Sequence, residues 1–76
     1  MSDYGVILFH TSSAAMRAEA VLHRAKVAVK LIPTPREFSS DCGISLRFDW
    51  SQKERVGVLL SESRVEVAEI HRLTRR

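Results

Sequence analysis

Hydrophobic positions along this chain follow two periods in turn, one typical of strands and the other typical of helices. Gly5 to His10 is a run of strand length with apolar residues at consecutive positions, which predicts a central strand buried on both faces. From Ala14 to Ala25, small and aliphatic residues recur at helical spacing, and the hydroxyl residues Thr11 to Ser13 can cap this helix. The first third of the chain therefore predicts a strand followed by an amphipathic helix.

The pattern returns to alternation in the middle of the chain. Val27 to Ile32 alternates with period two, which predicts a half-buried second strand. After an irregular interval, apolar residues at 44, 46 and 48 alternate with Ser45 and Arg47 and predict a third strand.

A second helix and a fourth strand complete the pattern. Asp49 or Ser51 can cap a helix over residues 51–61, whose inward positions are aliphatic. Arg64 to Leu73 predicts the fourth strand, with a change of phase near Ala68 that indicates a bulge.

The order β-α-β-β-α-β predicts an α+β fold of the ferredoxin-like, split βαβ type: a four-stranded antiparallel sheet with two helices on one face, in a single domain over residues 1–76. With right-handed crossovers, we expect the first and third strands to lie parallel in the centre. That arrangement would bring Tyr4, Cys42 and the basic C-terminal segment to one edge of the sheet. The Thr11 to Ser13 cap would lie at the opposite edge.

Composition narrows the class of protein. The chain has 76 residues, of which 45% are apolar and 28% charged, as expected for a small soluble domain with one compact core. A net charge of +3 allows attraction to anions without identifying nucleic acid as a partner. One cysteine excludes an intramolecular disulfide and favours a reducing compartment, and the first residues fit neither a signal peptide nor a membrane span. We therefore expect a cytoplasmic protein without a membrane partner.

The irregular interval from Pro33 to Gly43 is the candidate functional segment, because it contains both prolines and the only cysteine. Thr34 and Glu37 have the spacing of a capping box around Pro35, which predicts a short helical turn inside the loop. We expect Phe38 to anchor this loop by packing against the sheet edge or the end of a helix.

Cys42 is the candidate reactive residue. A cysteine reacts as the thiolate, which the positive charge of Arg36, Arg47 or the tail arginines Arg72, Arg75 and Arg76 would favour. Asp41 and the C-terminal end of a helical turn would disfavour it. The sequence alone leaves the sign of the net effect open. Ser39, Ser40 and neighbouring backbone N–H groups could donate hydrogen bonds to a sulfur or selenium anion on Cys42, or to a small oxyanion. A lone cysteine is also commonly a small buried core residue, which is the structural alternative.

Other chemistries find little support. His10, His23 and His71 fall on different elements without ligand spacing, so we expect no metal site, and the chain has no phosphate-binding glycine loop or hydrolase motif, so we expect no cofactor. The third strand, I-S-L-R-F-D-W, lacks the glycine and aromatic spacing of a ribonucleoprotein motif, which disfavours RNA binding. The edge strands of so small a sheet could pair with a second copy of the chain, so a homodimer is possible.

Three segments of the chain resemble one known family. They are H-T-S-S-A-A-M-R-A-E after the first strand, V-K-L-I-P-T-P-R-E, and S-S-D-C-G-I-S-L-R-F. Together they resemble the small bacterial family described as putative selenium/sulfur carrier protein-like, formerly a domain of unknown function. The family pattern of a proline-arginine pair, serines and a Cys-Gly step maps onto Pro35 and Arg36, Ser39 and Ser40, and Cys42 and Gly43.

The resemblance implies that Cys42 carries sulfur or selenium as a persulfide or selenopersulfide between protein partners. A donor of the cysteine-desulfurase type would load it and a downstream acceptor would receive the atom. In that role the protein would be at most a sulfurtransferase-like carrier rather than a turnover enzyme. The alternative is a non-enzymatic binding module of ferredoxin-like type, with a structural Cys42 and a loop that binds an anion or another protein.

Overall fold

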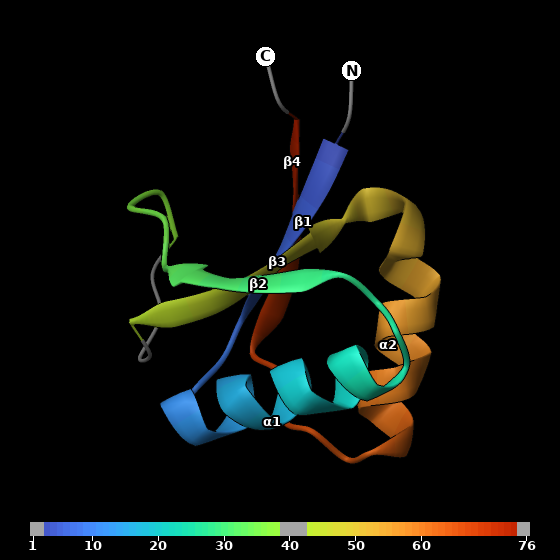
Figure 1. Ribbon diagram of the computed structural model, residues 1–76. Helices are drawn as coiled ribbons and strands as arrows, with labels where there is room; N and C mark the ends of the chain where they lie inside the picture. Colours follow the sequence, from blue (N-terminus) through green and yellow to red (C-terminus); the bar gives the residue numbers. More distant parts are fainter. Residues whose placement is uncertain (1–2, 39–42, 75–76) are drawn as a thin grey trace.

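The structure is a computed structural model, and it describes residues 3–38 and 43–74. Four strands form one sheet, and two helices cover one of its faces (Figure 1). The elements are β1 (Asp3–Leu8), α1 (Ser12–Arg24), β2 (Val29–Pro33), β3 (Ile44–Asp49), the 3₁₀ turn η1 (Trp50–Gln52), α2 (Lys53–Glu62) and β4 (Glu69–Thr74). The strand order β2-β3-β1-β4, with every neighbouring pair antiparallel, confirms the predicted ferredoxin-like arrangement.

The expected direction of the third strand is wrong. β1 and β3 pair antiparallel, with Tyr4 opposite Asp49 and Leu8 opposite Ser45. The reason is the connectivity: the α1 crossover keeps β2 in the direction of β1, and the β2–β3 connection then reverses the chain. The start of β3 therefore lies beside the end of β1. Gly43 and Tyr4 consequently lie at different ends of the sheet.

The main core lies between the sheet and the helices. Phe48 of β3 packs over Gly5 of β1, where a side chain on Gly5 would overlap the Phe48 ring. Absence of a side chain at this position lets an aromatic ring occupy the centre of the sheet. The buried residues of this core are Ile7, Phe9, Ala15, Ala18, Leu22, Val27, Leu46, Phe48, Val56, Leu60 and Val65.

Side-chain oxygens cap the starts of the helical segments. The Thr11 side chain accepts a hydrogen bond from the Ala14 N–H at 3.1 Å, as the sequence predicts for α1. Asp49 caps η1 by accepting from the Ser51 N–H at 3.0 Å, and α2 follows directly.

Both helices end in the same six-residue hydrogen-bond pattern. After α1, the Lys26 N–H donates to the His23 carbonyl and the Val27 N–H to the Leu22 carbonyl, at 2.9 and 2.8 Å. Lys26 adopts the left-handed conformation, with φ of 64°, and Val27 is buried. This is a Schellman motif with a buried apolar residue at its last position.

The end of α2 repeats this motif. Arg64 is left-handed with φ of 56°, and the buried Val65 donates to the Leu60 carbonyl at 3.0 Å. Val27 and Val65 therefore belong to helix ends, and the predicted strand starts at 27 and 64 are wrong: β2 begins at Val29 and β4 at Glu69. Neither helix in the described residues has the length and apolar character needed to cross a bilayer.

Candidate functional site

The candidate segment connects β2 to β3, and hydrogen bonds close its base. The Thr34 N–H donates to the Gly43 carbonyl at 3.0 Å, which joins the two ends of the loop. The Thr34 and Ser45 hydroxyls share a second hydrogen bond at 2.8 Å, and Ser45 is fully buried. Because a buried hydroxyl requires a partner, this pair satisfies Ser45 while it fixes the start of the loop against β3.

The first half of the loop is a single turn. The Phe38 N–H donates to the Pro35 carbonyl at 3.1 Å, which places Arg36 and Glu37 at the exposed corner. The capping-box pattern thus gives one hydrogen-bonded turn between 35 and 38, without an assigned helix in the described part of the loop.

Phe38 folds the loop over the sheet face that the helices leave open. Its ring stacks on that of His71 in β4, with centroids 4.3 Å apart and planes inclined by 17°. His71 Nε2 and Glu69 Oε1 lie 2.6 Å apart, which links the stacked imidazole to the start of the same strand. The expected anchor at a sheet edge is confirmed: Phe38 packs on a ring of the edge strand β4, not on a helix end.

Cross-strand register explains how this contact arises. Val6 lies opposite His71 on one side and opposite Arg47 on the other, so the three side chains share the open face. Val6 is fully buried although it faces away from the helices. A loop that reaches β4 through Phe38 lies on the face to which Val6 points, in agreement with that burial.

The described structure places two of the five predicted site residues. Arg36 is exposed in the turn, and Gly43 is exposed at the entry to β3. Apart from the chain neighbours of Gly43, nothing lies within 4 Å of the position that a β-carbon would take there. Cys42, Ser39 and Ser40 lie outside the described residues.

Two other predicted neighbours of the loop lie elsewhere. Arg47 stacks on the Tyr4 ring, 4.2 Å from its centroid, about 13 Å along β3 from Gly43 at the usual rise of ~3.3 Å per residue. Arg72 donates from Nε to Asp3 Oδ2 at 2.9 Å, also at the end of the sheet where β1 begins. Of the arginines that the structure describes, Arg36 is the one within the loop.

Asp49 has a shifted pKa, and it lies far from the loop. The backbone hydrogen bond from Ser51, followed by the Ser51 side chain, lowers the pKa of Asp49 below its usual value. Within residues 3–38 and 43–74, no three histidine, cysteine, aspartate or glutamate side chains gather in a group that could hold a metal ion. The described part of the site therefore offers hydroxyls, one guanidinium and a histidine-glutamate pair as its polar groups.

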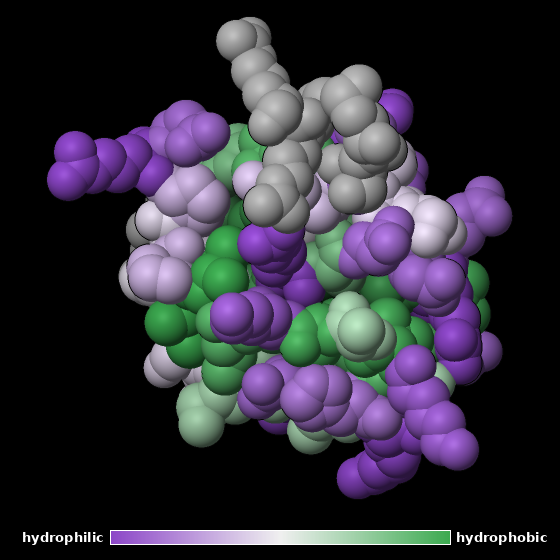
Figure 2. Space-filling view, turned by 45° about the horizontal axis from the view of Figure 1, so that its top comes forward, coloured by the Kyte–Doolittle hydropathy of each residue, from purple (hydrophilic) through white to green (hydrophobic). Residues whose placement is uncertain are grey.

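The distribution of hydrophobic surface adds one observation. On the face shown in Figure 2, strongly hydrophilic side chains separate the hydrophobic areas from one another. The visible described surface thus lacks the continuous apolar area that commonly marks a permanent protein interface.

A sequence profile of one family, described as "Putative Se/S carrier protein-like", matches residues 4–72. The chain belongs to this family. The match runs from β1 to β4 and includes the whole β2–β3 loop, so the resemblance seen in the sequence is confirmed. No curated protein and no solved structure matches the chain significantly.

The structure brings to the loop a residue that the sequence did not connect with it. The sequence analysis considered His71 only as a metal-ligand candidate, whereas in the structure His71 contacts the loop through Phe38. The aromatic character of Phe38 was a local signal for an anchor. The ring on which Phe38 stacks depends on the strand order, because that order brings β4 beside β1. No local sequence pattern predicts this order.

Proposed function

We propose that this protein carries sulfur or selenium on Cys42, as a persulfide or selenopersulfide, and passes it to a partner protein. The match of the Se/S carrier protein-like family across residues 4–72 is the observation that carries the proposal, since it spans the only cysteine of the chain. The exchange would take place between proteins in the cytoplasm, where a single cysteine stays reduced.

The described ends of the loop support this role. Gly43, the residue after Cys42, accepts a hydrogen bond from Thr34, and Phe38 stacks on β4. The four residues between these two attachment points include the proposed carrier residue. Because Phe38 and Gly43 are already held by these contacts, the described ends of the loop need little further ordering when a partner binds, which favours transfer between proteins.

Loading needs one thiolate exchange. The Cys42 thiol gives up its proton, and the thiolate attacks the outer sulfur of a persulfide on a donor cysteine. A bond forms between Cys42 Sγ and that sulfur while the donor S–S bond breaks, and the donor cysteine leaves as a thiolate that takes up a proton. The sulfur moves without net oxidation, so the step requires no cofactor; selenium would transfer by the same exchange.

The remaining predicted site residues take supporting roles in this proposal. The hydroxyls and backbone N–H groups of Ser39 and Ser40 would donate hydrogen bonds to the terminal anionic sulfur. The exposed Arg36 would supply positive charge that favours the thiolate, and the exposed Gly43 would leave the entry to β3 open to a partner.

Intact-mass spectrometry tests the proposal directly. The protein is incubated with a cysteine desulfurase and cysteine, and we expect the wild type to gain the mass of one sulfur atom. A reductant should remove the added mass, and cyanide should release it as thiocyanate, because cyanide attacks the outer sulfur and leaves the Cys42 thiolate. Cys42→Ser is the matched control, and equal addition to this variant would refute the proposal.

Alkylation separates the carrier from the alternative of a structural cysteine. Iodoacetamide should modify Cys42 in the folded protein at a rate comparable with the rate in denaturant. Modification that occurs only after unfolding would support the binding module, in which Cys42 is part of the scaffold.

A further inference from the structure

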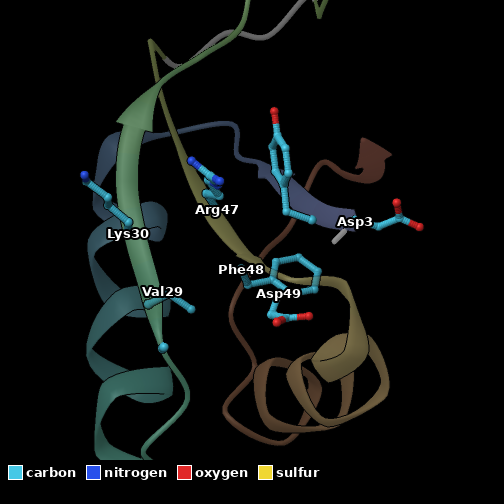
Figure 3. A pocket seen from close by; sticks show the side chains of 8 residues that line it. Asp3, Val29, Lys30, Arg47, Phe48 and Asp49 are labelled. Carbon is cyan, nitrogen blue, oxygen red and sulfur yellow. The ribbon is translucent and has the colours of Figure 1, made fainter. Parts of the chain in front are cut away.

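The two edge strands of the sheet differ in their protection against pairing with another chain. β2 and β4 each have one strand neighbour within the described residues, so each leaves a row of backbone groups unpaired. On β2, Pro33 ends the strand, and the exposed Lys30 side chain is directed away from Arg47 of β3 (Figure 3). Proline and lysine are common devices that keep an edge strand from pairing. β4, with the sequence Glu-Ile-His-Arg-Leu-Thr, contains neither of them.

The charged side chains of β4 are paired within the chain. Arg72 donates to the Asp3 carboxylate, which draws the guanidinium inward toward β1. His71 Nε2 and Glu69 Oε1 lie 2.6 Å apart. The charges of β4 therefore do not repel a second strand in the way that an unpaired lysine would.

Hydrogen bonding shows which residues of β4 face the open edge. The Ala68 N–H donates to the Leu8 carbonyl at 2.8 Å, so the backbone of Leu8 faces β4. Its cross-strand partner Glu69 faces β1 in return. Because successive residues of a strand direct their backbone groups to opposite sides, Ile70 and Arg72 face outward. Their N–H and carbonyl groups are the ones that a further strand could bind.

An apolar hollow of about 300 Å³ borders the same strand. Ile70 lies opposite Ile7, a core residue, so its side chain leaves the sheet on the helix-covered face. A chain that pairs with β4 would therefore lie beside the hollow and could cover it. The residues that line it are Gly57, Leu60, Ser61, Val65, Val67 and Ile70.

The sequence of β4 is complementary to itself when two copies run antiparallel. A two-fold axis through Ile70 sets this residue opposite Ile70 of the partner subunit and brings the two hollows together. The same axis sets Glu69 opposite His71 of the partner subunit, twice, on the open face. An axis through Glu69 would oppose two carboxylates, and an axis through His71 would oppose two imidazoles. The axis through Ile70 is therefore the favoured one.

Glu69 and His71 can form these contacts without giving up their own. A carboxylate has two oxygens, and one of them, Oε1, meets His71 of the same chain. The second oxygen can accept a hydrogen bond from His71 of the partner subunit. The side chains of Glu69 and His71 are 63% and 36% exposed, so both are accessible.

We infer that this protein forms a homodimer in which the β4 strands of two subunits pair antiparallel about Ile70 and join the two sheets into one. The inference does not depend on sulfur transfer. One short strand and one small hollow on each subunit make a smaller interface than that of a permanent dimer. We therefore expect a reversible dimer with a dissociation constant on the order of 10 µM.

Sedimentation velocity of the wild type over about 1 µM to 1 mM tests the dimer. We expect a shift from monomer to dimer across this range. The amide hydrogens of Ile70 and Arg72 should exchange more slowly as the dimer forms, because they become hydrogen-bonded. A chain that stays monomeric at the highest concentration would overturn the inference. So would a dimer in which the Ile70 amide exchanges at the monomer rate.

Charge-reversal variants test the pairing register. Glu69→Lys and His71→Glu should each weaken self-association about tenfold, because each removes two complementary cross-strand pairs. Glu19→Lys makes the same change of charge on α1 and should leave self-association unchanged. Equal weakening by Glu19→Lys and Glu69→Lys would show a general effect of charge and would refute the register.

A mixture of the two charge variants gives a result that damage to the fold cannot give. In a heterodimer of Glu69→Lys with His71→Glu, the two substituted side chains lie opposite each other with opposite charges. The unsubstituted His71 and Glu69 also face each other. Native mass spectrometry with one variant isotope-labelled should show the heterodimer in excess over both homodimers. Absence of this excess would contradict pairing about Ile70.

A threonine substitution tests the apolar contact at the axis. Ile70→Thr keeps the β-branched shape but places a hydroxyl beside each hollow, and it should weaken self-association about tenfold. Ile32→Thr makes the same change at a half-buried position of β2 and should leave self-association unchanged. Equal effects of the two substitutions would refute β4 as the interface.

Discussion

The side chain of Phe48 sets the limit on what position 5 can accept. Because the ring occupies the space beside Gly5, a methyl group there must displace a buried aromatic ring. We expect Gly5→Ala to lower the free energy of unfolding by about 1–3 kcal/mol, the usual cost of overpacking a core. Urea denaturation followed by the fluorescence of Trp50 measures the change.

Gly57 provides the matched control for this substitution. It lies in the middle of α2, and a β-carbon there would meet nothing within 4 Å. Gly57→Ala should raise the free energy of unfolding by about 0.5–1 kcal/mol, because alanine loses less conformational entropy in a helix. Stabilisation by Gly5→Ala would contradict the role assigned to the Phe48 ring.

The free energy of unfolding depends on the ionisation state of Asp49. Its pKa is lowered in the folded protein, so its contribution is complete above the unfolded value of about 3.9 and is lost as the pH falls through the folded value. Asp49→Asn keeps an oxygen that can cap η1 but removes the titration. We expect the wild type to exceed this variant in stability at pH 7 and the difference to shrink below pH ~4.

Urea unfolding at a series of pH values gives this comparison. Glu66→Gln, which removes an exposed carboxylate from the segment between α2 and β4, is the control for the change in net charge. A difference between the wild type and Asp49→Asn that stays constant down to pH ~2 would argue against the Ser51 hydrogen bonds as the cause.

At the scale of elements, the two helix ends are further places where stability can be gained. Lys26 and Arg64 adopt the left-handed conformation that costs a residue with a β-carbon roughly 1 kcal/mol. We expect Lys26→Gly and Arg64→Gly each to raise the free energy of unfolding by about 0.5–1 kcal/mol. Thermal or urea unfolding of each variant measures the gain.

Substitution by glycine one residue earlier at each helix end is the control, because it introduces the same residue where the backbone is not left-handed. Ala25 and Ser63 have φ near −85°, where glycine gives no conformational advantage. Ala25→Gly and Ser63→Gly should therefore destabilise the protein or leave it unchanged. A gain of similar size at all four positions would refute the conformational explanation.

These helix ends also show why the sequence misplaced two strands. Val27 and Val65 are apolar and β-branched and precede real strands, so each looks like a strand start. The structure uses them to close Schellman motifs against Leu22 and Leu60. Glycine is the usual signal for such an ending, and its absence at 26 and 64 left the pattern without a marker. The elements themselves were predictable because α1 and β3 have strong periodicity and Thr11 has a clear capping role.

At the scale of the whole molecule, the loop was predictable and its surroundings were not. Composition and irregularity located Pro33 to Gly43, and the family match includes it. The direction of each strand decides which residues lie beside the loop. The sequence analysis predicted the wrong direction for the third strand. Arg47 and Tyr4 consequently belong to the far end of the sheet, where the Arg47 guanidinium stacks on the Tyr4 ring.

The stack of Phe38 on His71 joins the loop to a strand that is remote in sequence. A double-mutant cycle with Phe38→Ala and His71→Ala should give a coupling energy of about 0.5–1.5 kcal/mol, because aromatic pairs contribute that much beyond buried area. Urea unfolding of the four proteins supplies the values. The loss of the His71 contact with Glu69 occurs in both arms that contain His71→Ala and cancels, so additive effects would show that the two rings do not interact.

The pairing of β1 with β4 gives the molecule a direction of mechanical weakness. Asp3 lies directly opposite Thr74, so the start of β1 and the end of β4 lie side by side (Figure 1). A force that pulls residues 3 and 74 apart would load the hydrogen bonds of this strand pair one after another, since they lie perpendicular to the strands. Such a force would peel β4 from the sheet and carry with it His71, the residue on which Phe38 rests. Tension on residues 3 and 74 would therefore reach the β2–β3 loop before it reached the helices.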